Sequence, residues 1–243
     1  MIYTVIISHH QSEWICRFPF HGSTVVVLDD PTDADFESCD KAGYDSICMY
    51  VQGNRGKNRN AGIDYILETY RPSSTDVIQC FDGDRIPIKY NEQYIMNAMS
   101  AHSIGILLFT CEHDQRLKKI NLAVDSTAII DTGVICNPFY SCGFAATVDS
   151  IKRIKACNCD SLFNPRFKEW GCEDQFTGLL CYQCGIRVGL TNKIQLRGSV
   201  GGDENTHECY RDSLQEYIDA IREFNIPIRT VADPMVVCQN GVI

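Results

Sequence analysis

The chain has 243 residues, of which 44% are hydrophobic and 22% are charged, and its formal net charge is −9. This length and apolar content suit one large α/β domain or two small ones with a sizeable core. The acidic balance argues against general nucleic-acid binding through a basic surface. No apolar run approaches the ~18 residues of a membrane span. We therefore expect no nucleic-acid partner and no membrane span.

The first residues predict a strand and not a targeting signal. Residues 1–8 are mostly apolar but lack the basic region of a signal peptide. We therefore expect a cytoplasmic protein. The 14 cysteines are scattered, and several lie in apolar, strand-like runs, where a free thiol behaves as a small hydrophobic group. Most of these thiols are expected to be reduced and buried.

Strands and helices alternate through about the first 110 residues. Apolar runs predict strands at 3–8, 23–30 and 47–51 and a further strand that begins at Val77, and helical spacing predicts a helix at 61–70. This alternation predicts an α/β fold with a mixed, mainly parallel sheet flanked by helices. In such sheets ligands bind beyond the carboxyl ends of the strands. Four acidic residues are expected at such ends: Asp29, Asp30, Asp82 and Asp84.

The second half continues the α/β pattern. The last predicted helix has apolar residues at helical spacing, which favours a face packed on the core over a membrane or partner helix. The loop at 164–174 is rich in turn formers, aromatic residues and acids. Strands are predicted at 105–110 and 127–136, and helices at 91–101, 147–155, 175–183 and 207–224.

The stretch from Val77 to Pro87 carries two acids that flank a glycine. Alternate residues at a strand end share a face, so the carboxylates of Asp82 and Asp84 can point the same way. Neighbouring carboxylates repel each other unless a cation lies between them, and Mg²⁺ and Mn²⁺ prefer oxygen ligands. Gly83 permits a sharp turn, and Pro87 is expected to stop the strand. The alternative is a solvated turn, since this tripeptide is common turn chemistry.

Three separated stretches resemble motifs of the metal-dependent GT-A glycosyltransferases, which use nucleotide-sugar donors. Residues 53–62 (GNRGKNRNAG) are similar to a donor-side segment, residues 81–87 (FDGDRIP) to the Asp-x-Asp metal motif, and residues 170–174 (WGCED) to an acceptor-side motif. The resemblance is to glycosyltransferase family 2 and the β-1,4-galactosyltransferase-like group. It spans about residues 1–210, and the order and spacing of the motifs make it specific.

The resemblance implies one GT-A (Rossmann-like) domain over residues 1–243. Residues 1–115 would form the nucleotide-sugar-binding half and residues 116–210 the acceptor and catalytic half. Residues 211–243 would form a C-terminal helix and tail. The implied activity is that of a hexosyltransferase that uses Mn²⁺ or Mg²⁺.

The donor side is expected around the basic residues Arg55, Lys57 and Arg59. They lie near a predicted helix N-terminus, which is a natural environment for a diphosphate, although a solvated basic loop is the alternative. The resemblance implies that the two arginines contact the base or phosphates, and that Asp29 or Asp30 recognises uracil or ribose. The implied donor-binding residues are Ser8, Asp29, Asp30, Arg55, Arg59 and Asp82.

The acceptor side is expected at residues 170–174. An acceptor hydroxyl must lose its proton as it attacks the anomeric carbon, and Asp174 is the predicted general base. The resemblance implies that Glu173 orients the acceptor and that Trp170, followed by Gly171, stacks on a sugar. Gly143 lies in a stretch that resembles an acceptor element of the family. The alternative is that Glu173 and Asp174 are simply acids that favour a helix N-terminus.

The resemblance also implies a third metal ligand. His207 follows a glycine-containing loop, as a metal-binding histidine does in related enzymes, so the implied ligands are Asp82, Asp84 and His207. A surface histidine at a helix start is the alternative.

The sequence thus favours an inverting glycosyltransferase. It would move a hexose or N-acetylhexosamine from a UDP-sugar to a hydroxyl of a glycan or glycoprotein. One rival is a zinc-binding interaction module, and another is a nucleotidyltransferase, although the region after the first strand lacks the usual glycine-rich basic signature. A third rival is an inactive relative of these enzymes. In the zinc-binding module, the ligands would be Cys157, Cys159, Cys181 and Cys184.

Overall fold

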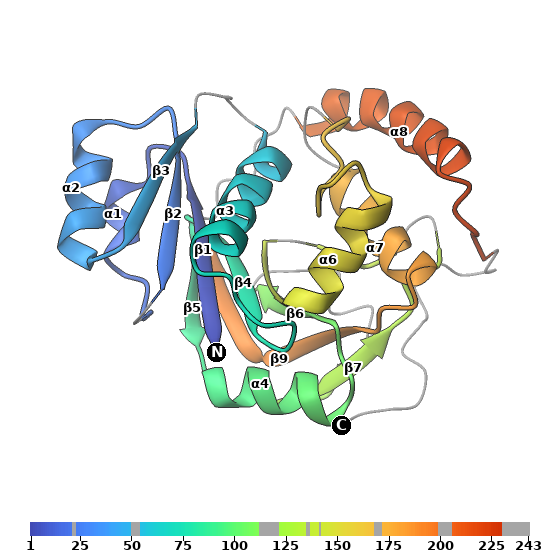
Figure 1. The fold of residues 1–243 in the computed structure, drawn as a ribbon, viewed down its shortest axis with the longest axis horizontal. Helices are drawn as coiled ribbons and strands as arrows, with labels where there is room; N and C mark the ends of the chain where they lie inside the picture. The colour runs from blue at the N-terminus through green and yellow to red at the C-terminus, as the bar shows by residue number, and fades with distance from the viewer. Residues whose placement is uncertain are drawn as a thin grey trace.

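The computed structural model describes residues 1–20, 23–49, 54–111, 122–134, 137–140, 142–167, 172–198 and 206–229 (Figure 1). The strands are β1 (Ile2–Ser8), β2 (Thr24–Asp29), β3 (Asp45–Met49), β4 (Val77–Asp82), β5 (Arg85–Lys89), β6 (Ile106–Cys111), β7 (Thr127–Ile130), β8 (Gly143–Thr147) and β9 (Val188–Gly198). The helices are α1 (Ser12–Ile15), α2 (Asp33–Ala42), α3 (Arg55–Thr69), α4 (Glu92–Ala101), α6 (Val148–Cys157), α7 (Glu173–Gln183) and α8 (Thr206–Glu223).

The strands form one 9-stranded sheet in the order β3-β2-β1-β4-β8-β6-β9-β5, with β7 paired to β9. In the N-terminal half, β1 is parallel to both β2 and β4, and β2 is parallel to β3. The apolar, β-branched residues of β1 and β2 are buried on both faces, as expected of central parallel strands. The predicted alternation of strands and helices is confirmed here.

The second half of the sheet introduces antiparallel strands. β8 runs antiparallel to β4 and β6, and β9 is parallel to β6 but antiparallel to β5 and β7. The expected mixed α/β sheet is therefore confirmed, and its parallel pairings lie mainly in the N-terminal half. The sequence patterns did not predict β8, β9, α1 or α2.

Helices cover both faces of the sheet, which gives three layers (Figure 1). Alternate residues of β1 belong to the two cores: Val5 lies in the core that includes residues of α3, α6, α7 and α8, while Ile6 lies in the core that includes residues of α1, α2 and α4. α3 lies very close to the sheet at Gly62. A Cβ atom there would lie 2.4 Å from Val5 Cγ1 and 2.9 Å from Val27 Cγ2. Only glycine permits this approach without a shift of its neighbours.

Two predicted boundaries are wrong. The helix predicted at 61–70 begins earlier, at Arg55. The Asn54 side chain accepts a hydrogen bond from Lys57 N and caps α3 there. Pro87 does not stop the chain from pairing. It lies within β5, which pairs with β9 at the edge of the sheet and has an irregular register after Pro87. Edge strands tolerate proline because the missing N–H leaves no inner ladder bond unmade.

The other predicted elements lie close to the observed ones. The strand predicted at 127–136 ends at Ile130, and residues 135–136 lie outside the described residues. The helices predicted at 91–101, 147–155, 175–183 and 207–224 correspond to α4, α6, α7 and α8. Among the helices that the structure describes, no helix combines the length and the apolar character that crossing a membrane requires.

Candidate active site

The carboxyl ends of β1, β2 and β4 meet at one edge of the sheet. Ile7 of β1 pairs with Asp82 of β4, and Ser8 pairs with Leu28 of β2, one residue before Asp29. The N-terminus of α3 adds Arg55 to this edge, since its guanidinium contacts Asp82. The acidic strand ends predicted from the sequence are therefore brought together with the basic segment.

Arg59 connects this edge to the start of α7. Its Nη2 atom donates to Asp82 Oδ1 at 2.8 Å, and its Nη1 atom lies 3.8 Å from Asp174 Oδ1 and 4.0 Å from Glu173 Oε1. The guanidinium also lies over the Phe163 ring, 5.3 Å from its centroid. The buried guanidinium of Arg59 thus lies beside carboxylates from both halves of the predicted site.

The electrostatics of Arg59 follow from these partners. Its side chain is only 3% exposed. Burial by itself would lower the pKa of Arg59, but Asp82, Asp174 and Glu173 outweigh burial and raise that pKa above its ordinary value. The guanidinium is therefore permanently charged, and it offsets part of the repulsion among the three carboxylates.

Asp82 is held by two arginines. Besides Arg59, the Arg55 Nη1 atom donates to Asp82 Oδ2 at 3.2 Å. The Asp82 side chain is 4% exposed, whereas that of Arg55 is 34% exposed. Arg55 is therefore the arginine of this pair that solvent and a diphosphate can reach, while Arg59 is enclosed by protein.

Gly83 and Asp84 form the turn after Asp82. Gly83 N donates to Ile7 O at 2.7 Å, and a Cβ atom on Gly83 would lie 2.8 Å from that oxygen, so the turn requires glycine. The Asp84 side chain is 15% exposed, with its Oδ1 atom 3.6 Å from Arg85 Nε. Asp84 is the more accessible of the two motif carboxylates.

The described acidic residues do not enclose a metal ion by themselves. Within the part of the chain that the structure describes, no group of three or more His, Cys, Asp and Glu side chains is arranged to hold a metal ion. His207 lies in α8, but its side chain is outside the described residues. Asp84 fits a site in which one carboxylate and the phosphate oxygens of a donor share the cation, which is a common arrangement for Mg²⁺.

The ends of β1 and β2 carry paired histidines and acids. Asp29 is buried and accepts a hydrogen bond from Asn58 Nδ2 at 3.1 Å, and the His9 ring nitrogen lies 3.1 Å from the Asp29 carbonyl oxygen. Asp30 is half-exposed, with an oxygen 3.6 Å from His10 Nε2. Asp29 is therefore part of the fold, and Asp30 faces solvent. The sequence alone does not distinguish these two acids.

Ser8 is the remaining predicted donor residue at this edge. Its side chain is buried, and its Oγ atom has no hydrogen-bond partner among the described residues. A buried hydroxyl without a protein partner calls for an explanation, and a bound ligand or water can supply the missing bond.

The predicted acceptor side is described in part. Glu173 and Asp174 form the first turn of α7, and their side chains are 11% and 18% exposed. Trp170 and Gly171 lie outside the described residues. Gly143 begins β8, where it pairs with Phe81, and a Cβ atom there would lie 2.4 Å from Leu196 Cδ1. Packing alone therefore explains this glycine.

Two asparagines without a predicted role, Asn54 and Asn60, connect α3 to the segment before α7. Asn60 makes a two-way contact with Phe163, since its Nδ2 donates to Phe163 O at 2.7 Å and its Oδ1 accepts from Phe163 N at 3.0 Å. Asn54 Nδ2 donates to Phe167 O at 3.3 Å. These bonds fix the segment before α7 to the start of α3. Their signal in the sequence is the asparagine-rich helix start.

The cysteines proposed as zinc ligands do not form a four-thiolate group. Cys157 and Cys184 bring their Sγ atoms to 3.3 Å, but these two cysteines, Cys159 and Cys181 do not form a metal-holding cluster in the described residues. Cys181 is buried and Cys159 is exposed. The zinc module is therefore not supported.

The sequence matches no known family profile and no curated protein. Solved structures share the fold. The structure of TarS from S. aureus covers 94% of this chain at 14% identity and a TM-score of 0.61, and 40% of the TarS chain is covered in turn. TarS 1–349 in complex with UDP-GlcNAc gives 14% identity, 94% and 68% coverage and a TM-score of 0.61.

GalNAc-T7 with UDP, GalNAc and Mn²⁺ gives 9% identity, 93% and 49% coverage and a TM-score of 0.61. This chain therefore spans less than half the length of full TarS and of GalNAc-T7. At these identities the similarity establishes the fold, which is the GT-A glycosyltransferase fold expected from the three motifs.

Proposed function

We propose that this chain is a glycosyltransferase that moves a sugar from a UDP-sugar to a hydroxyl group. The observation that carries the proposal is Arg59, whose guanidinium contacts Asp82 at the carboxyl edge of the sheet and lies beside Asp174 at the start of α7. This proximity supports a single site in which Asp82 would lie on the donor side and Asp174 on the acceptor side. The fold relatives TarS and GalNAc-T7, solved with UDP-GlcNAc and with UDP and Mn²⁺, support the donor class.

The donor diphosphate would lie against Arg55 and Asp84. Arg55 is partly exposed and starts a helix whose N-terminal amides favour anions. Asp84, with His207 as a further candidate, would hold Mn²⁺ or Mg²⁺, which supplies positive charge to the leaving diphosphate. Ser8 and Asp30 would contact the nucleoside, because the buried Ser8 hydroxyl has no partner among the residues that the structure describes and Asp30 faces solvent.

Arg59 and Asp29 would not contact the donor, although the resemblance implies that they do. Both are buried and bonded within the protein, so they would position the residues that contact the donor and would not reach it themselves. Arg59 would hold Asp82 in place through a charge-assisted hydrogen bond.

Asp174 would be the general base. The acceptor oxygen attacks the anomeric carbon, the bond from that carbon to the diphosphate oxygen breaks, and UDP leaves with the electron pair. The acceptor proton passes to the Asp174 carboxylate. A single base with no separate nucleophile corresponds to inversion at the anomeric carbon. Glu173, Trp170 and Gly171 would orient a glycan or glycoprotein acceptor, and the sugar would be a hexose or an N-acetylhexosamine.

Calorimetric titration with UDP tests the donor half of this proposal. We expect binding in Mn²⁺ that weakens by at least about tenfold in a chelator, since a cation shared with phosphate contributes directly to affinity. The Asp84→Ala variant should lose the Mn²⁺ dependence while its circular dichroism spectrum stays unchanged. Equal UDP affinity in Mn²⁺ and chelator would remove the metal role, and no UDP binding at all would contradict the donor class.

A further inference from the structure

Two cysteines at the ends of neighbouring helices bring their sulfur atoms into contact. Cys157 is the last residue of α6, and Cys184 directly follows α7. Their Sγ atoms are 3.3 Å apart. Cys157 is exposed and Cys184 is partly exposed, so solvent and small molecules can reach the pair. Figure 1 shows α6 and α7 on the same side of the sheet.

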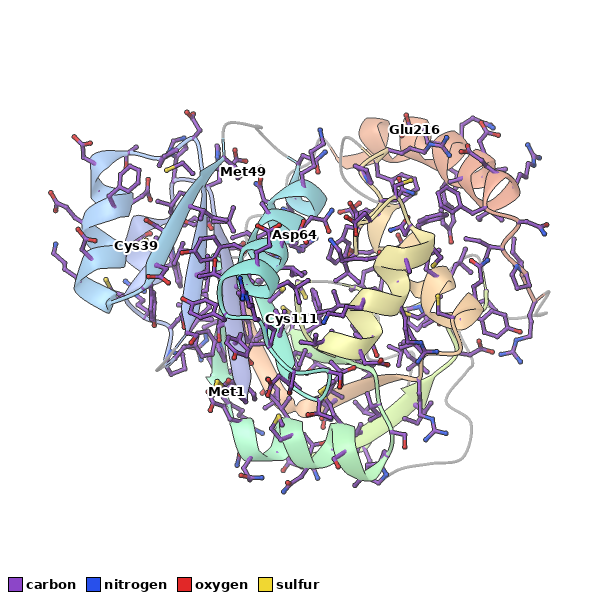
Figure 2. The ribbon with its side chains drawn as sticks, in the orientation of Figure 1. Met1, Cys39, Met49, Asp64, Cys111 and Glu216 are labelled. Atoms are coloured by element: carbon purple, nitrogen blue, oxygen red, sulfur yellow. The ribbon has the colours of Figure 1, made fainter. Side chains whose placement is uncertain are left out.

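One contact that does not involve sulfur joins the ends of the two helices, and two further contacts position the end of α6. The Arg153 guanidinium of α6 donates to the carbonyl oxygen of Cys184. The thiol of Cys157 donates to Ile154 O at 3.2 Å, and Lys155 Nζ donates to Asp64 Oδ1 at 2.7 Å. Figure 2 labels Asp64 on α3. The two thiols are thus presented to each other by a packed scaffold, so little ordering entropy remains to be lost when they join.

We propose that Cys157 and Cys184 form a thiol modification site that reacts with a low-molecular-weight disulfide of the glutathione class and closes to a disulfide bond. One cysteine thiolate attacks a sulfur of oxidised glutathione, breaks its S–S bond and releases one glutathione thiolate. The second cysteine thiolate then attacks the protein sulfur of the mixed disulfide and releases the other glutathione. The protein loses two electrons and two protons, and oxidised glutathione gains them as two glutathione molecules.

The bond would bracket the candidate acceptor segment. The two cysteines are separated by 27 positions in the sequence, and Glu173 and Asp174 lie between them. A disulfide would join the C-terminal end of α6 to the C-terminal end of α7, the helix whose first turn carries the two carboxylates, and would close a loop that contains them. This consequence rests on the proposed function, whereas formation of the bond does not.

A second cysteine pair in the chain provides an internal comparison. Cys111 Sγ and Cys142 Sγ are 4.0 Å apart, and both residues are partly buried beside the candidate site. Their mutual hydrogen bond, followed by burial, raises the pKa of Cys142 well above its ordinary value. Burial, followed by the hydrogen bond with Cys184, raises the pKa of Cys157 to about 12. The raised pKa values keep Cys142 and Cys157 as thiols at neutral pH, so solvent access distinguishes the two pairs and favours Cys157 and Cys184.

The test is a glutathione redox titration of the full chain. The protein is incubated at pH 8, which increases the thiolate fraction, in buffers of rising oxidised-to-reduced glutathione ratio. It is then quenched with acid, alkylated while unfolded, digested and analysed by mass spectrometry. We expect a cross-linked peptide that joins Cys157 to Cys184, and we expect it at lower ratios than any link between Cys111 and Cys142.

Three variants identify the bond. Cys157→Ser and Cys184→Ser should each abolish the cross-link. Cys159→Ser is the matched control, because Cys159 is also exposed and lies in the same turn, and it should leave the cross-link intact. The proposal is overturned if the wild-type link runs through Cys159 or Cys181, if either pair variant keeps it, or if Cys157 and Cys184 stay reduced at ratios that oxidise the unfolded chain. None of these readouts requires a transferase substrate.

Discussion

The donor-side and acceptor-side carboxylates are held differently by the same arginine. Asp82 is bonded at contact distance by Arg59 and Arg55, and its side chain is 4% exposed. Glu173 and Asp174 lie 4.0 and 3.8 Å from Arg59 and keep more solvent contact. Asp82, on the proposed donor side, is therefore enclosed by the fold, whereas Glu173 and Asp174, on the proposed acceptor side, are held less closely and are slightly more exposed. Donor-side changes should cost stability, and acceptor-side changes should cost turnover.

Arg59→Met should produce the largest effect. Methionine keeps much of the apolar packing on Phe163, but it leaves Asp82 buried without its closest partner. Removal of one partner from a buried ion pair typically costs about 3–5 kcal/mol. We expect a loss of this order in the free energy of unfolding, measured by urea denaturation.

The double variant Arg59→Met/Asp82→Asn is the matched control. It removes the buried carboxylate charge that Arg59 no longer balances, and it should recover part of the lost stability, because Arg55 alone remains beside Asp82 in the single variant. A loss below about 1 kcal/mol for Arg59→Met, in the range of surface ion pairs, would show that Asp82 is not held as the comparison requires.

Asp174→Asn should lower turnover by roughly 10²-fold or more, which is the usual contribution of a general base. Affinity for UDP should change by less than about tenfold, since the proposed donor contacts do not include Asp174. Glu173→Gln is the control, because it lies in the same turn beside the same arginine, and it should lower turnover less. A loss confined to donor binding would instead make Asp174 a helix-start acid.

Gly62→Ala tests the close packing of α3 on the donor side. The new Cβ atom meets Val5 and Val27 within 2.9 Å, and overpacking of a core typically costs about 1–3 kcal/mol. Gly56→Ala is the comparison in the same helix. Its Cβ atom would meet Phe163 Cβ at 3.3 Å, so thermal denaturation should give a smaller loss. Equal losses would contradict a more tightly packed donor side.

Arg55→Met should have the smallest effect on the fold. The Arg55 side chain is 34% exposed, and Arg59 still pairs with Asp82. We expect UDP affinity to fall by about tenfold, in line with one charge-assisted hydrogen bond, with an unchanged melting temperature. A large stability loss without an affinity change would reverse the roles assigned to the two arginines.

The sequence predicts the donor half of the fold well. β1, β2 and β4 are mostly apolar and rich in β-branched residues, and β2 and β4 place their acidic ends at one edge of the sheet. The same pattern does not predict β8 or β9. β8 is short and rich in small residues, and β9 carries polar residues such as Asn192 and Lys193. Pairing partners far away in the sequence make these segments strands, and a local pattern does not contain that information.

The role of Arg59 also lies beyond the local pattern. With the helix start placed at residue 61, Arg59 is a solvated loop residue available to phosphate. Because Asn54 caps the helix, α3 begins at Arg55. Arg59 then lies within the helix and faces the edge of the sheet, where it contacts Asp82 and lies beside Asp174. The residue types of the site could be predicted from the three motifs, but the burial that separates Arg59 from Arg55 required the packed structure.

Nucleotide release from a panel of UDP-sugars tests the central claim most directly. Even without a known acceptor, water can replace the acceptor hydroxyl, so the wild-type chain should release UDP from at least one hexose or N-acetylhexosamine donor in Mn²⁺. Release should fall sharply in a chelator and in Asp174→Asn. The account is contradicted if no UDP-sugar is hydrolysed or transferred, or if release is the same in the variant and in the wild-type chain.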